Sequence, residues 1–100
     1  MSAQTLTVLV LLRAKPGLAD QVQAEIESQL TAIRAEQEAC LTIVGNRHDE
    51  DRDRFLIYEL WRSRAEFDAF YAGNESLNAY LARMKELVAE GGLTMWEAIA

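Results

Sequence analysis

The chain has 100 residues, of which 50% are hydrophobic and 26% charged, and its formal net charge is −6 at pH 7. A chain of this length and composition folds around one hydrophobic core, so we expect a single domain over residues 1–100. The excess of acidic residues repels phosphate backbones and anionic lipid surfaces, so we expect no nucleic-acid partner and no membrane partner.

The first third of the chain predicts a strand followed by a helix. Residues 5–12 are mostly apolar or β-branched, which is typical of a strand, and the turn sequence at 15–17 ends it. From residue 18 to about residue 37, apolar side chains recur every three or four positions, as they do along one face of an amphipathic helix. These apolar side chains belong to Leu18, Val22, Ile26, Leu30 and Ile33.

The middle of the chain predicts two strands joined by a charged turn. Residues 40–47 and residues 54–61 have the apolar and β-branched character of strands. Between them lies the segment Asp49–Asp53, which contains only charged residues and is typical of a turn. His48 stands beside this turn, and we expect it to be a solvated turn residue rather than a catalytic base.

The last third of the chain predicts two helices and a final strand. Ser63 and Glu66 have the spacing of a capping box, so a short helix begins here and ends near Gly73. Asn74 is a suitable N-cap for a second helix, which we expect to end at the glycine pair 91–92. Residues 93–98 then form the fourth strand.

The predicted order β-α-β-β-α-β, with its second helical element split in two, is the α+β ferredoxin-like arrangement. Its four-stranded antiparallel sheet carries helices on one face only. The first and third strands are nonetheless apolar on both faces. In the first strand Leu9 and Leu11 point away from Val8 and Val10. In the third strand Ile57 points to one face, and the other face carries Leu56, Tyr58 and Leu60. Exposing such a face to water is unfavourable, so we expect a homodimer through the sheet face.

Several segments, by their order and spacing, resemble the antibiotic biosynthesis monooxygenase family. They are Lys15-Pro16-Gly17, Cys40-Leu41, the run from Tyr58 to Ser63, residues 65–67 and Met95-Trp96-Glu97. The resemblance implies a dimeric α+β barrel with a pocket between sheet and helices. Characterised members of the family use that pocket to oxidise phenols or quinols with molecular oxygen, without flavin or metal.

The chain departs from the family at several polar positions. Ile43, Asn46, Phe70 and Ser76 stand where many members carry tyrosine or histidine. The haem-degrading branch of the superfamily has Asn, Trp and a haem-ligating His at positions that align with Val10, Phe70 and Tyr80. Because all three are replaced, we expect no haem, and in keeping with the family no flavin or metal.

Tyr80 and Glu59 are the catalytic candidates. Tyr80 lies on an apolar helical stripe, where it is either a core tyrosine or a group that hydrogen-bonds or deprotonates a phenolic substrate. Glu59 shares a strand face with Ile57 and Trp61. A carboxylate in such a setting has a raised pKa or an ion-pair partner, for which Arg13, Arg62 and a partner subunit are the candidates.

The expected substrate-binding residues are Trp61, Asn46, Phe70, Tyr71, Val10 and Arg83. Each has a structural alternative: Trp61 is also suited to packing, Asn46 to turn chemistry and Arg83 to an ion pair with Glu86. Cys40 is the only cysteine, so no intrachain disulfide is possible, and a small core residue in a reducing compartment is expected. The sequence therefore favours a cytoplasmic protein.

The leading functional hypothesis is a cofactor-independent monooxygenase that acts on a small phenol or hydroquinone. A binding module without catalysis, which holds a small hydrophobic ligand in the same pocket, is the first alternative, and the missing family histidines favour it. An isomerase of a small carbonyl compound is the second, since one fold supports several reactions.

Overall fold

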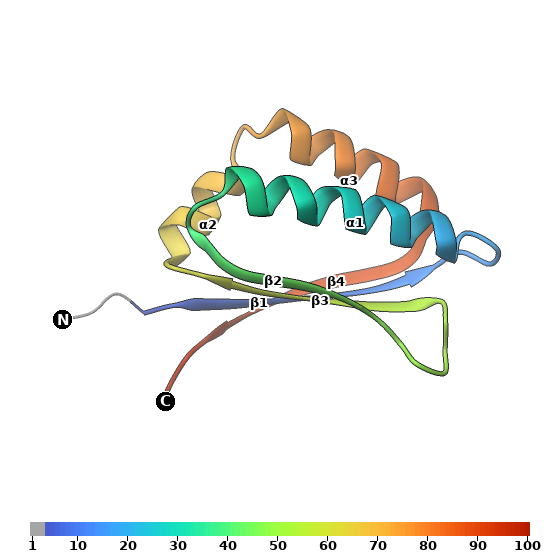
Figure 1. The fold of residues 1–100 in the computed structure, drawn as a ribbon, viewed down its shortest axis with the longest axis horizontal. Coiled ribbons are helices and arrows are strands. Elements are labelled where there is room, and N and C mark those ends of the chain that lie inside the picture. Colours follow the sequence, from blue (N-terminus) through green and yellow to red (C-terminus); the bar gives the residue numbers. More distant parts are fainter. Residues whose placement is uncertain (1–3) are drawn as a thin grey trace.

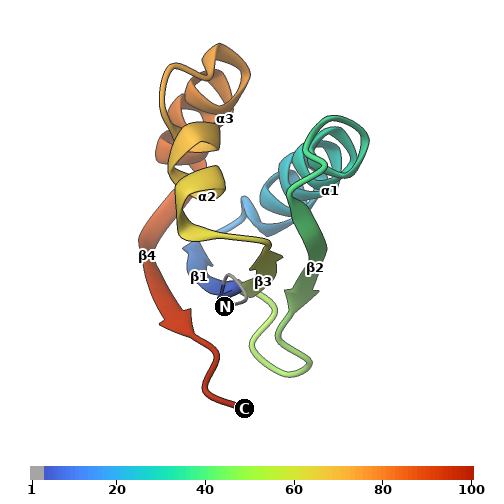
Figure 2. The ribbon, with the colours of Figure 1, turned by 90° about the vertical axis from the view of Figure 1, so that its left-hand side faces the viewer.

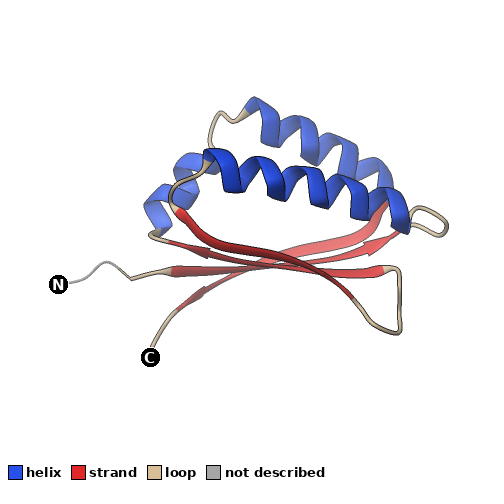
Figure 3. Ribbon diagram, in the orientation of Figure 1, coloured by secondary structure: helices blue, strands red, loops and turns tan. Residues whose placement is uncertain are grey.

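The computed structural model describes residues 4–100, so residues 1–3 of the expected domain lie outside the described part. Its seven elements follow the predicted order (Figures 1 and 3). They are β1 (Leu6–Ala14), α1 (Ala19–Glu36), β2 (Cys40–Arg47), β3 (Arg54–Trp61), α2 (Arg64–Tyr71), α3 (Glu75–Leu87) and β4 (Val88–Glu97). The α+β ferredoxin-like fold class is confirmed.

The four strands form one antiparallel sheet in the order β2-β3-β1-β4. The central pair, β1 and β3, is in register with Val8 opposite Glu59 and Val10 opposite Ile57. All three helices lie over the same face of the sheet (Figure 2). The core fills the space between these two layers, and the alternation of β1 and β3 sends every second side chain into it.

Local capping interactions explain where α2 and α3 begin. Ser63 Oγ accepts the backbone N–H of Glu66 at 3.2 Å, which confirms the predicted N-cap, and the Glu66 carboxylate accepts from the Ser63 hydroxyl at 2.9 Å rather than from its backbone N–H. Asn74 Oδ1 accepts the backbone N–H of Leu77 at 2.9 Å. Between the two helices Gly73 has a φ of +64°, a value that favours glycine and lets the chain reverse there.

The predicted end of α3 is wrong. The helix ends at Leu87, and β4 starts at the next residue, which pairs with Ala14 of β1. The glycine pair 91–92 lies inside β4 instead of capping the helix. No glycine is required at the helix end, because the backbone N–H of Lys15 donates to the Leu87 carbonyl at 2.9 Å. The helix therefore ends where the chain begins to pair with β1.

The turn between β2 and β3 is built around His48. Its Nδ1 accepts the backbone N–H groups of Glu50 and Asp51 at 3.1 and 2.9 Å. Asp51 in turn accepts a hydrogen bond from Arg13 of β1 at 3.0 Å. His48 is therefore a turn residue, as expected, and does not line the cavity.

The face of the sheet opposite the helices is not covered by any element within residues 4–100 (Figures 1 and 2). By strand register it carries Leu9 opposite Tyr58 and Leu11 opposite Leu56. Leu11 is 52% exposed and Trp96 of β4 is 55% exposed. We call this surface the outer sheet face.

None of the helices in the described part of the chain is both long and apolar enough to span a bilayer.

Candidate active site

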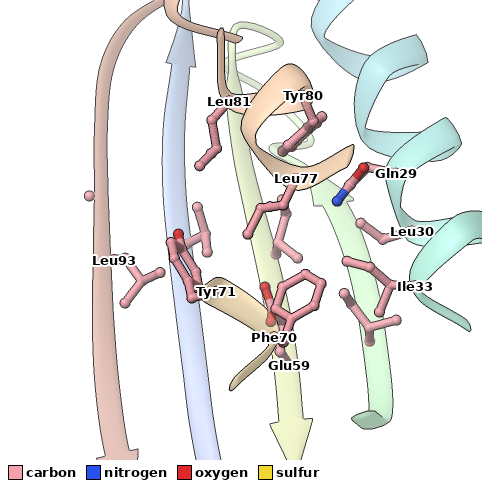
Figure 4. Close-up of a pocket in the computed structure, with 14 residues that line it drawn as sticks. Gln29, Leu30, Ile33, Glu59, Phe70, Tyr71, Leu77, Tyr80, Leu81 and Leu93 are labelled. Carbon is pink, nitrogen blue, oxygen red and sulfur yellow. The ribbon is translucent and has the colours of Figure 1, made fainter. Parts of the chain in front are cut away.

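A cavity of about 240 Å³ lies between the sheet and the helices (Figure 4). An apolar cavity of about 150 Å³ holds a benzene molecule, so this one has room for one substituted aromatic ring. Its walls are mainly apolar and include Leu30, Ile33, Ile43, Ile57, Leu77 and Leu93. Four lining side chains bear polar groups: Gln29 of α1, Glu59 of β3, Tyr71 of α2 and Tyr80 of α3.

Glu59 lies on the floor of the cavity and is only 8% exposed. The indole Nε1 of Trp61, two residues along the same face of β3, donates to Glu59 Oε1 at 2.8 Å. Within residues 4–100, every side-chain oxygen or nitrogen that is completely shielded from solvent has a hydrogen-bond partner. Glu59 Oε2 accepts no hydrogen bond from these residues, so it is not completely shielded. Oε2 is therefore accessible from the cavity.

The electrostatic surroundings of Glu59 favour its neutral form. Burial raises the pKa of Glu59, and the hydrogen bond from Trp61 only partly offsets this. The two arginines that the sequence offered as ion-pair partners are engaged elsewhere, since Arg13 binds Asp51 and Arg62 binds Glu66. Within residues 4–100, Trp61 is the group that hydrogen-bonds the Glu59 carboxylate.

The two tyrosines of the cavity keep their protons at neutral pH. Tyr80 is 7% exposed, and burial together with the nearby Glu59 raises its pKa to about 12. Partial burial and Glu59 also raise the pKa of Tyr71, which is 39% exposed at the end of α2. The Tyr80 hydroxyl has no hydrogen-bond partner within residues 4–100 and, by the same reasoning as for Glu59 Oε2, is accessible. Both phenols can therefore donate a hydrogen bond to a ligand.

Gln29 is a cavity residue that sequence reasoning missed. It is 8% exposed, lies on α1 and points toward the cavity, close to Tyr80 in the view of Figure 4. The signal was present in the sequence, because Gln29 follows Ile26 by three positions and precedes Ile33 by four, which puts its amide on the apolar face of the helix.

The remaining expected residues divide into two groups. Val10 and Phe70 line the cavity, and their role in substrate binding stays a prediction. Trp61 is fully buried beside it, with its ring centroid 5.0 Å from that of Phe70, so it supports the cavity wall and Glu59 without lining the cavity. Val10, Phe70, Tyr71, Tyr80 and Glu59 are thus brought together in one place.

Asn46 and Arg83 are not brought to the cavity. Asn46 lies opposite Leu56, so the alternation of β2 places it on the outer sheet face, where its amide donates to the Leu56 carbonyl at 3.3 Å. Arg83 is exposed on α3 and binds Glu25 of α1 at 2.8 Å. Arg83 therefore forms an ion pair, as the structural alternative predicted, but its partner is Glu25 and not Glu86.

A metal centre is not apparent in the part of the chain described. Within residues 4–100, no three His, Cys, Asp or Glu side chains group as a metal site requires. Cys40 is half-buried against the core, and burial, with Glu59 nearby, raises the pKa of its thiol to about 11. The expectation that the protein needs no flavin, metal or haem stays a prediction.

The fold and the site define a small α+β domain with a ring-sized apolar cavity that presents a buried carboxyl and two neutral phenols. The sequence model of the family described as antibiotic biosynthesis monooxygenase matches residues 5–80. The chain belongs to this family. A comparison with curated proteins gave no match.

Solved structures share the fold over nearly the whole chain. A Pseudomonas aeruginosa protein has a TM-score of 0.88 at 21% identity and covers 100% of this chain and 99% of its own. A Mycobacterium tuberculosis protein has a TM-score of 0.83 at 22% identity, with 96% of each chain covered. A Deinococcus radiodurans protein, provisionally named an antibiotic biosynthesis monooxygenase, has a TM-score of 0.86 at 19% identity and covers 95% of this chain and 93% of its own.

Proposed function

We propose that the protein oxidises a small phenol- or hydroquinone-type aromatic with molecular oxygen, without flavin, metal or haem. The observation that carries this proposal is the buried carboxyl of Glu59, which has one oxygen open to an apolar cavity the size of one substituted ring. Membership of the antibiotic biosynthesis monooxygenase family supports an oxidative activity.

In the proposed reaction Glu59 removes the phenolic proton, and the electron-rich phenolate transfers electrons to oxygen. A C–O bond then forms at a ring carbon that bears hydrogen, ortho or para to the phenolate oxygen. The O–O bond breaks, the ring carbon loses its hydrogen and becomes a carbonyl, and the second oxygen atom leaves as water. Phenol and one O2 thus give quinone and one water, and the substrate supplies all four electrons.

The surroundings of Glu59 suit the role of a general base. Its raised pKa makes the carboxylate a better proton acceptor than an exposed glutamate, because a base is most effective when its pKa lies nearer the working pH. Tyr80 stays neutral and donates a hydrogen bond to a substrate oxygen. A bound ring would displace water from the mainly apolar walls, which strengthens these polar interactions.

Oxygen uptake tests this proposal. Protein stripped of metal and flavin is given a panel of substituted phenols and hydroquinones in an oxygen electrode. We expect uptake that falls about 10²- to 10⁴-fold in Glu59→Gln, which cannot take a proton, and that also falls in Tyr80→Phe. Glu86→Gln, an exposed change on α3, is the matched control. Tight binding of panel members without uptake would favour a binding module and contradict the proposal.

We also propose that a second copy of the chain covers the outer sheet face. Leu11, Val44 and Trp96 on this face are 52%, 42% and 55% exposed. Burial of apolar surface stabilises by about 25 cal/mol per Å², so pairing two such faces is favourable. The partner would also hold the sheet that forms the floor of each cavity, and the assembly would be the dimeric α+β barrel.

A cytoplasmic location completes the proposal. The lone Cys40 cannot form an intrachain disulfide, which suits a reducing compartment. Fractionation of cells that express the tagged protein tests this, and recovery in the medium or an oxidising compartment would contradict it.

A further inference from the structure

Gln29 presents an unsatisfied amide to the cavity. The residue is more than nine-tenths buried, and no other side chain or backbone group within residues 4–100 hydrogen-bonds its amide. Because every fully inaccessible side-chain polar atom in that range has a partner, the amide nitrogen and oxygen remain accessible from the cavity. Burying an amide without a partner is unfavourable, and leucine at this position would match the rest of the stripe. The amide is therefore free to bind water or a ligand that enters the cavity.

Gln29 and Tyr80 lie on the helix side of the cavity, across from Glu59. Gln29 projects from α1 and Tyr80 from α3, whereas Glu59 rises from β3 in the sheet. In Figure 4 the labelled Leu77 and Ile33 flank the space between the Gln29 amide and the Glu59 carboxyl, one on each side. The cavity thus has a polar group at the sheet, an apolar middle, and an amide with a phenol at the helices.

We propose that Gln29, together with Tyr80, is a specificity-determining residue that binds a second oxygen substituent of the ligand. The ligand class is then an aromatic ring that carries oxygen at both ends, with its ionisable hydroxyl at Glu59 and a carbonyl or hydroxyl oxygen at Gln29. This inference rests on the proposed function for the kind of ring, and it adds how the ring is oriented and selected.

The chemistry of the two helix-side groups fits an oxygen in either form. The amide of Gln29 has two donors and an acceptor, so it can serve a carbonyl oxygen or a hydroxyl group. Tyr80 adds a neutral donor, since its pKa is raised to about 12. A ring without the second oxygen would leave both groups unpaired, and sites built to hydrogen-bond a substituent discriminate against analogues that lack it.

Calorimetric titration with two probes of similar shape tests the inference. The probes are 4-hydroxyacetophenone, which has the second oxygen, and 4-ethylphenol, which lacks it. We expect the wild-type protein to bind 4-hydroxyacetophenone at least about fivefold more tightly, the ratio that one neutral hydrogen bond supports. In Gln29→Leu this preference should shrink to what Tyr80 alone supplies, because the carbonyl of 4-hydroxyacetophenone loses the amide donor while 4-ethylphenol binds at least as well as before. Gln21→Leu, an exposed glutamine on the same helix, is the matched control.

The outcomes separate this inference from the proposed function. Equal affinities for the two probes in the wild-type protein, or an undiminished preference in Gln29→Leu, would overturn the role of Gln29. Absence of binding of both probes to the wild-type protein would overturn it as well. Binding with the expected preference but no oxygen uptake would uphold the role of Gln29 and contradict only the proposed oxidation.

Discussion

Glu59 and Trp61 form a buried pair in which the indole N–H is the carboxylate's hydrogen-bond donor within residues 4–100. Removal of this donor should raise the pKa of Glu59 further, because burial then acts without an opposing hydrogen bond. We expect an NMR titration of the Glu59 side-chain carboxyl to give a higher pKa in Trp61→Phe than in the wild-type protein. An unchanged or lower pKa would show that the indole does not stabilise the carboxylate.

The raised pKa of Glu59 also predicts how stability depends on pH. At pH values below the ordinary pKa of 4.5, both the folded and the unfolded chain hold the proton. As the pH rises from there through the folded-state pKa, the unfolded chain loses its proton first, so Glu59 costs the folded state stability. Glu59→Gln removes this cost and keeps an oxygen for the Trp61 N–H.

Urea unfolding of the wild-type protein and of Glu59→Gln at about pH 4 and about pH 7 tests this pH dependence. The free energy of unfolding of the variant should exceed that of the wild-type protein at about pH 7, and the gain should shrink toward about pH 4. Equal differences at both pH values would mean that the pKa of Glu59 is not raised by folding.

The site was partly predictable at the level of single residues. The burial of Glu59 was predictable because its carboxylate alternates with apolar residues along one strand. This pattern involves only residues that are neighbours in the sequence. The inward orientation of Gln29 was missed, because the apolar residues alone define the stripe of α1 and a glutamine is more often found on the exposed side of a helix. Arg83 pairs across helices with Glu25, a contact that depends on how α1 and α3 pack and that spacing along one helix does not reveal.

Among the elements, α1 packs tightly against β2 at Gly45. A Cβ at this position would lie 3.1 Å from Ile26 Cγ2 and 3.1 Å from Leu30 Cδ2. Gly45→Val should therefore force the helix away from the strand and destabilise the fold by about 1–3 kcal/mol, with Gly45→Ala intermediate. Thermal unfolding measures both. A valine variant as stable as the wild-type protein would show that the helix moves freely.

Element order was predictable, whereas one element boundary was not. The strand alternation and the caps at Ser63 and Asn74 are local signals, and both caps are present in the structure. The end of α3 is decided by pairing with β1, since the residue after Leu87 already lies opposite Ala14. The glycine pair at 91–92 suggests a helix end locally, but this non-local pairing overrides it.

At the scale of the whole molecule, the outer sheet face is the feature that predicts assembly. Light scattering should give a mass of twice the 11.3 kDa chain, and Leu11→Lys should shift it toward one chain because a charge would be buried between the two sheets. Ala82→Lys, on the exposed side of α3, should leave the mass unchanged. A wild-type mass near 11.3 kDa would contradict the proposed dimer.

The central proposal is that the substrate alone reduces oxygen in the cavity beside Glu59. Turnover of a phenol or hydroquinone under isotopically labelled oxygen gas, with metal- and flavin-free protein, tests it most directly by mass spectrometry. We predict one labelled oxygen atom in the quinone product, the other in water, and one O2 consumed per product. Unlabelled product formed together with hydrogen peroxide, or no product at all, would contradict the proposal.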